Sequence, residues 1–199
     1  MDSDWQRVLV FAGEQGKFVQ TWGSEVLYIG GYTGYNFNTK IGKFKTCFDS
    51  FEFDSILEAD KYHPKAVKES HLLGRLGDIA FWDAKRECVV LFGGKMPFQA
   101  NSSIKELQND VLLYDVDNMR IDDQILFTEA SIERRMHHCG FMIGDSIFSV
   151  GGICKDGSCL DEFIEIDIQT RKKSFARVSS GAAYITKHHS ASMCSVFYP

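Results

Sequence analysis

Proline, cysteine and long apolar runs are scarce in this chain of 199 residues. Three prolines beside sixteen phenylalanines and seven tyrosines favour strands, since aromatic side chains suit a pleated, half-buried surface. Six cysteines are too few for a disulfide scaffold of this size, so we expect free thiols and a reducing, cytoplasmic location. No apolar run approaches the ~20 residues that a membrane-spanning helix requires, so no membrane partner is expected.

Strong charge and a secretory leader are also missing from the sequence. The net charge of −5 gives no basic stripe, which argues against nucleic acid as a partner. The opening MDSDWQRVLVF is acidic and contains only a four-residue apolar run, Val8 to Phe11, unlike a signal peptide. We therefore expect a soluble protein with a single domain, because this length suffices for one core and barely for two.

One pattern occurs three times along the chain. In each copy a short apolar run ends in two glycines: Gly30-Gly31, Gly93-Gly94 and Gly151-Gly152. The first glycines of these doublets are 63 and 58 residues apart. A further strand pattern follows each doublet and closes on an aspartate: Asp49, Asp115 or Asp167. In the third copy, strands are predicted at Cys139 to Ile143 and Ile147 to Val150, and fourth strands are predicted at 124–127 in the second copy and 174–178 in the third. Several short strands in a period near 50 residues are typical of the blades of a β-propeller.

The repeated unit resembles the kelch repeat. In that family a first strand opens on Arg-x-x-His-Ser-Ala and a third strand has the form Asn-Asp-Val-x-x-Tyr-Asp. Arg135 and His138 match the first motif, and His189-Ser190-Ala191 matches it again, with Thr186 in place of the arginine. Arg75 with Asp78-Ile79-Ala80 is a weaker match.

The third-strand motif is matched closely by residues 109–115, NDVLLYD. The units depart from the family at the fourth strand, where Ile121 and Phe175 stand in place of the expected tryptophan. The resemblance covers residues ~24–194 and depends on three doublets and their partner motifs being in phase.

The resemblance implies an all-β fold, a partial kelch-type β-propeller with about three four-stranded antiparallel blades plus one strand of a fourth. The expected divisions are blade 1 at 1–54, an insertion or linker at 55–75, blade 2 at 76–128, blade 3 at 129–180 and the start of a further blade at 181–199. The insertion has a helix pattern from Pro64 to Gly74, and Ser103-x-x-Glu106 has capping-box spacing. Since propellers have ~4–8 blades, we expect a fragment, a truncated copy or an oligomer that completes its ring. Open blade edges also make self-association an expectation.

Repeat position assigns several residues to the framework. Glycine doublets permit a sharp turn at positive φ, and aspartates at strand ends can accept backbone N–H bonds. The run Val89 to Phe92 predicts a strand buried on both faces, which we expect beside the propeller axis. The predicted framework residues are Gly30, Gly31, Asp49, Gly93, Gly94, Asp115, His138, Gly151, Gly152, Asp167 and His189.

Metal, thiol and anion sites are weaker interpretations. The pairs His137-His138 and His188-His189 could indicate a metal, but adjacent strand residues face opposite sides and each second histidine occupies a repeat position. Cys154 and Cys159 could form a labile disulfide, yet free thiols are preferred, and zinc would need four ligands. Arginines at positions 75, 134 and 135 could face an anionic ligand, but ion pairs between blades explain them better. We expect no cofactor, no metal and no catalytic residues.

The remaining candidates form a loop surface for a protein or peptide partner. The loops after the doublets carry Tyr32, Tyr35 and Phe98, and aromatic side chains are enriched at interfaces. With Arg134 and Arg135 they are the predicted binding residues of a non-enzymatic interaction module; Met96 and Ile153 lie in the same loops. The alternative is that these loop side chains fold back onto the blades. Other functions left open are a fragment of a larger adaptor, such as a ubiquitin-ligase substrate receptor or cytoskeletal scaffold, and a propeller-type enzyme such as a sialic acid isomerase or copper-radical oxidase.

Overall fold

The computed structural model describes strand backbone at 17–20, 25–29, 41–47 and 50–57, and backbone with side chains at 74–96, 107–118, 120–128 and 130–175. This described part holds twelve strands and no helix, which confirms the expected all-β class. It therefore contains no helix that could cross a membrane. Several predictions lie outside the described residues: the strand at Val8 to Phe11, both helical segments and the blade start at 181–199.

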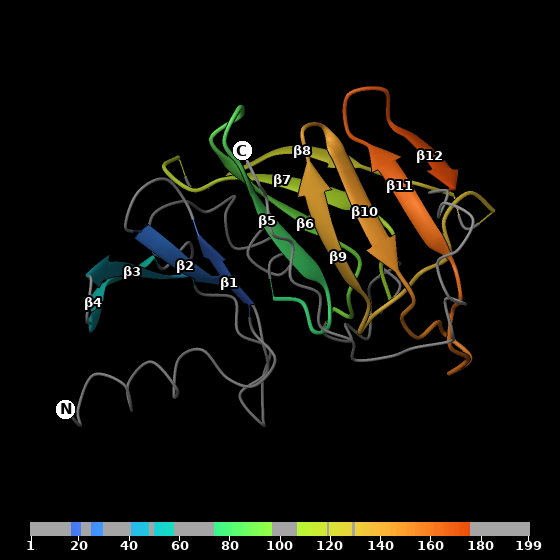
Figure 1. Cartoon of the computed structure of the whole chain (residues 1–199), viewed down its shortest axis with the longest axis horizontal. Helices are drawn as coiled ribbons and strands as arrows, with labels where there is room; N and C mark the ends of the chain where they lie inside the picture. Colours follow the sequence, from blue (N-terminus) through green and yellow to red (C-terminus); the bar gives the residue numbers. More distant parts are fainter. Residues whose placement is uncertain are drawn as a thin grey trace, which may run out of the picture.

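The strands form three four-stranded antiparallel sheets, each in chain order (Figure 1). The first sheet contains β1 (Lys17–Gln20), β2 (Glu25–Ile29), β3 (Ile41–Cys47) and β4 (Ser50–Leu57). The second contains β5 (Ile79–Asp83), β6 (Cys88–Phe92), β7 (Val111–Asp115) and β8 (Arg120–Ile125). The third contains β9 (Cys139–Ile143), β10 (Ser146–Val150), β11 (Phe163–Asp167) and β12 (Lys172–Phe175). β4 continues past residue 54, where the first unit was expected to end.

The fourth strands of the second and third units begin earlier in the chain than the sequence predicted. The second unit's fourth strand was expected at 124–127, but β8 begins at Arg120 and ends at Ile125. The third unit's was expected at 174–178, but β12 begins at Lys172. Both are edge strands that are rich in exposed polar residues, so they contain no apolar run to mark their limits.

The second and third sheets repeat one another beyond their strands. In both, the residue after the glycine doublet forms single-residue bridges to the segments before the first and third strands: Lys95 to Leu76 and Leu107, and Ile153 to Met136 and Cys159. A residue at positive φ also precedes each first strand by two positions, Gly77 at 67° and His137 at 54°. The weak sequence match around Arg75 is therefore the same structural unit as the strong match around Arg135.

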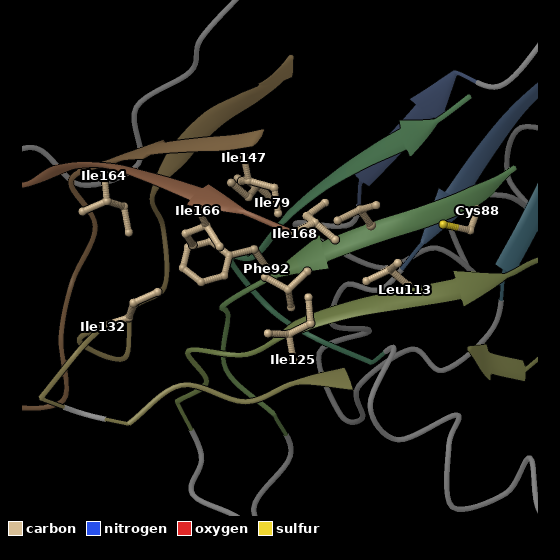
Figure 2. Close-up of a cluster of buried hydrophobic side chains, with 12 residues drawn as sticks. Ile79, Cys88, Phe92, Leu113, Ile125, Ile132, Ile147, Ile164, Ile166 and Ile168 are labelled. Carbon is tan, nitrogen blue, oxygen red and sulfur yellow. The ribbon is translucent and has the colours of Figure 1, made fainter. Parts of the chain in front are cut away.

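The larger of two core clusters in the described residues lies between the second and third sheets (Figure 2). A smaller cluster, which includes Val89, Leu91 and Leu112, lies on the other face of the second sheet. Every residue of β6 and β7 is buried, which confirms the prediction of a strand buried on both faces. The doublet strand is not the one nearest the neighbouring sheets, however. Contacts run from β5 to β1 and from β5 to β9, and Figure 1 shows β5 between the other two. The first strands of successive sheets therefore meet, while the fourth strands lie outermost.

Candidate interaction surface at the doublet end

The second and third sheets have two ends of different character. At one end, which we call the doublet end, Gly93-Gly94 and Gly151-Gly152 lie with the segments 74–78, 107–110 and 133–138. At the other, the turn end, lie the hairpin turns at 84–87, 116–118, 144–145 and 168–171. The predicted binding residues that fall within the described ranges, Arg134 and Arg135, belong to the doublet end.

Arg75 anchors the doublet end of the second sheet through a buried, two-pronged ion pair. Its two guanidinium nitrogens donate to the carboxylate oxygens of Asp110 at 2.8 and 2.9 Å, and one also donates to Gly93 O at 2.9 Å. The Arg75 side chain has no exposed surface and that of Asp110 has 2%. Burial alone would raise the pKa of Asp110, but the Arg75 charge and hydrogen bonds from Arg75 and Gln124 bring that pKa below its usual range.

Arg135 occupies the same place in the third sheet. It donates to Glu162 Oε2 at 2.7 Å and to Gly151 O at 3.4 Å, and its side chain is also fully buried. Both arginines thus join the segments before the first and third strands of their own sheet, and not two neighbouring blades as expected. Arg135 has no surface to offer a ligand, so we remove it from the predicted binding residues.

The glycine doublets permit close backbone contacts at this end. Gly93 and Gly94 have φ values of 69° and 88°, and Gly151 and Gly152 have 66° and 102°. A Cβ on Gly94 would lie 2.6 Å from the Cβ of Asp78. Side chains larger than hydrogen are therefore excluded from the second position of the doublet for steric as well as conformational reasons.

His138 joins the third sheet to the second. Its Nδ1 lies 2.8 Å from Ser149 Oγ within the third sheet, and its ring meets the ring of Phe92 edge-on with centroids 5.2 Å apart. These contacts are those of a framework residue packed between sheets. Among the residues that the structure describes, no three His, Cys, Asp or Glu side chains are grouped to hold a metal ion. His188 and His189 lie outside those residues.

The loop between β10 and β11 contains two free thiols, Cys154 and Cys159. Cys154 N donates to Ser158 O at 3.0 Å, whereas Cys159 forms the bridge to Ile153. Since neighbouring residues of an extended ribbon face opposite sides, the two thiols point apart. Cys154 Sγ donates to Asp156 Oδ1 at 2.8 Å, and this bond, with donors from Ser158, lowers the pKa of Asp156 to about 2.

The remaining predicted binding residues divide into two groups. Arg134 is half-buried, and its guanidinium donates to Leu107 O at 2.9 Å. Tyr32, Tyr35 and Phe98 lie outside the described residues, as do Gly30, Gly31, Asp49 and His189 of the predicted framework. Met96, in the loop after the second doublet, is only 2% exposed and folds back onto the sheet. The surface is thus left with the half-buried Lys95, Arg134 and Ile153, and with the exposed loop 155–158.

The turn end holds a network of ion pairs that the sequence did not indicate. Asp145 in the third sheet pairs with Lys85 at 2.9 Å and with Arg86 of the second sheet, and these bonds lower the pKa of Asp145. Arg171 pairs with Asp123 at 2.7 Å across the same junction. No local spacing reveals such pairs, because their members are 48 to 60 residues apart.

The aspartates that close the third strands cap turns at this end. Asp115 Oδ1 accepts from Asn118 N at 3.0 Å, and Asp167 Oδ1 accepts from Thr170 N at 2.6 Å. These bonds, together with others from the turns, lower the pKa of both carboxyls. The turn end is therefore closed by short capped hairpins and inter-sheet ion pairs, whereas the doublet end carries the longer loops.

Comparisons with known proteins add no family to these observations. A scan of the chain against models of protein families finds no match. A search of curated proteins likewise finds no significant match.

Proposed function

We propose that the chain is part of a kelch-type β-propeller and acts as a non-enzymatic interaction module. Its doublet-end loops bind a protein or peptide partner, with a few aromatic side chains and Arg134 as anchors. We also propose that residues 181–199 begin a fourth blade. The open blade edges would then allow the chain to self-associate. The repeated sheets, the meeting of their first strands and the equivalent arginine–carboxylate pairs support the propeller.

The observation that carries the binding function is a contrast between frame and loops. In the second and third sheets the glycine doublet occupies the same place. So does the carboxylate that pairs with the buried arginine, Asp110 in one sheet and Glu162 in the other. Between the doublet and this carboxylate, however, the second sheet has residues 95–109 and the third has residues 153–161, two loops of unlike length and sequence. Loops that vary on a rigid scaffold are where binding residues concentrate.

The anion-site and enzyme alternatives lose their main support. Two of the three arginines that could have faced an anionic ligand or substrate, Arg75 and Arg135, are buried and paired with carboxylates. The third, Arg134, is half-buried and donates to Leu107 O. Four described cysteines carry free thiols, Cys88, Cys139, Cys154 and Cys159, which supports the proposed cytoplasmic location. An adaptor role is a specific form of the binding function and needs no separate site.

Alanine substitution at the two ends tests the binding function. A variant with Tyr32, Tyr35 and Phe98 changed to Ala should lose at least ten-fold in recovery of a specific partner by affinity pulldown. The matched control changes three exposed turn-end residues, Asp117, Gln169 and Lys172, to Ala and should leave recovery unchanged. Equal recovery with both variants would place the binding surface elsewhere.

A further inference from the structure

The second and third sheets pack through unlike faces. The second sheet contributes the side chains of alternate strand positions that point toward the third: Ile79, Phe81, Val90, Val111 and Leu113. The third sheet contributes the opposite face of the same unit: Met142, Ile147, Ile164 and Ile166. At this junction the second sheet thus presents one face of the repeated unit and the third sheet presents the opposite face (Figure 2).

The third sheet carries an aromatic counterpart of the face that is covered in the second. Repeat position matches Phe81 with Phe141, Val90 with Phe148 and Val111 with Phe163. The rings of Phe141 and Phe148 stack with centroids 4.9 Å apart, and Phe163 lies 6.4 and 6.1 Å from them. Cys139 and the 51%-exposed Ile143 extend this surface, which we call the aromatic face. It is directed away from the second sheet.

We propose, in an inference that rests on the proposed propeller, that residues 186–194 lie on the aromatic face as the first strand of a further unit. In the preceding junction, residues 126–138, thirteen positions, connect the end of β8 to the start of β9. Residues 176–189, fourteen positions, separate the end of β12 from Ser190, the counterpart of Cys139. The chain therefore has nearly the same length with which to reach the next face.

Side-chain sizes support the same placement. In the existing junction Gly140 lies against Ile79: a Cβ on Gly140 would come within 2.8 Å of Ile79 Cδ1, and within 2.2 Å of Phe148 O in its own sheet. The corresponding pair in the proposed junction is Ala191 against Cys139. Alanine is larger than glycine by one methyl group, but the cysteine that it meets is smaller than isoleucine. Met193 takes the position of Met142, which packs on the second sheet. The alternate residues Ser190 and Ser192 would face away from the third sheet.

The backbone offers a docking point for this strand. In the existing junction Gly94 N donates to Arg135 O at 2.8 Å, and Arg135 N donates to Gln108 O at 3.2 Å. The equivalent atoms of the third sheet are Gly152 N and Leu160 O, which would pair with Thr186. A third bond, His137 N to Gly77 O, is not part of the proposal. A Cβ on Gly77 would lie 2.8 Å from His137 N, and the counterpart of Gly77 is His137, which carries one.

Cross-linking to the natural Cys139 tests the proposal in the full chain. The variant Ala191→Cys is treated with a short bifunctional thiol reagent, and linked peptides are mapped by mass spectrometry. The matched controls, Ser190→Cys and Ser192→Cys, place the new thiol on the opposite side of the proposed strand, which faces away from the third sheet. We expect an intramolecular link from position 191 to Cys139 at least five-fold above either control. Equal yields, a preference for position 190 or 192, or no link at all would overturn the placement, and a link between two chains would assign the face to a second copy instead.

Hydrogen exchange gives a second measurement that needs no cross-link. Met193→Asp should speed exchange of the peptide that contains the Gly152 amide by at least ten-fold, because a carboxylate is excluded from an aromatic face. Ser192→Asp, on the opposite side of the strand, should leave it unchanged. Exchange that is equally fast in the unmodified chain and in both variants would contradict the proposed strand.

Discussion

Arg75 and Asp110 form a charged pair inside the second sheet, joined by two hydrogen bonds across 35 residues of sequence. The pair fastens the start of the first strand to the start of the third, next to the carbonyl of the glycine doublet. Its counterpart, Arg135 with Glu162, does the same in the third sheet. The repeated sequence pattern is thus accompanied by a repeated electrostatic contact, which sets the distance between strands that are not neighbours.

Loss of Arg75 should be much more harmful than loss of Arg135. Arg75→Met leaves Asp110 buried without its cation and should lower the free energy of unfolding by about 3–5 kcal/mol. Arg135→Met should cost less, because the Glu162 side chain is 26% exposed and water can hydrate it. Urea unfolding of both variants measures the difference. Equal losses would mean that burial of the carboxylate does not determine the cost.

Removal of both partners in the second sheet should recover part of the loss. In Arg75→Met/Asp110→Leu no charge remains buried, and similar replacements of buried ion pairs are often neutral or stabilising. We expect the double variant to be more stable than Arg75→Met alone in the same urea titration. If the two losses simply add, Arg75 and Asp110 do not act as a pair.

Acid should weaken the protein partly through Asp110. Since the folded-state pKa of this carboxyl is lowered, its ionisation contributes stability above the unfolded-state pKa of about 3.9, and the contribution is lost as pH falls through the folded-state value. The difference in free energy of unfolding between the natural chain and Asp110→Asn should therefore be largest near neutral pH and shrink below about pH 4. A difference that stays constant from pH 7 to pH 3 would contradict this assignment.

Alanine at the second doublet position should be far more costly than alanine at another glycine with positive φ. Gly144→Ala at φ 57° meets no atom within 4 Å and should cost about 1–2 kcal/mol from backbone conformation alone. Gly94→Ala, at φ 88°, adds a clash with Asp78 Cβ at 2.6 Å and should lose clearly more in thermal unfolding. Similar losses in the two variants would show that the sheet relaxes around the new methyl group.

The sequence located the buried strands well because their signal is local. β9 has the predicted limits, and β6 and β10 each begin one residue earlier than their predicted apolar runs. Apolar runs that end in glycine mark such strands, whereas β8 and β12 have polar, exposed residues and were displaced by two to four positions. Burial thus determines how clearly a strand can be recognised.

The candidate surface was only partly predictable, because its determinants are non-local. The sequence placed Arg75 and Arg135 near the first strands but could not identify Asp110 and Glu162 as their partners, 35 and 27 residues away. Nor could it show that Met96 is buried while Lys95 remains half-exposed. The alignment of the repeats did match Arg75 with Arg135, and the structure places these two arginines at equivalent positions.

Site-specific photo-cross-linking tests the proposed function most directly. A photoreactive amino acid is placed singly at Lys95 or Lys155 at the doublet end, and at Asp117 or Gln169 at the turn end, in cells that express the chain. Lys155, Asp117 and Gln169 are exposed, and Lys95 is half-buried. We predict adducts with the same protein partner from the doublet end and none from the turn end. Adducts of equal yield from both ends, or from the turn end alone, would contradict binding through the doublet-end loops.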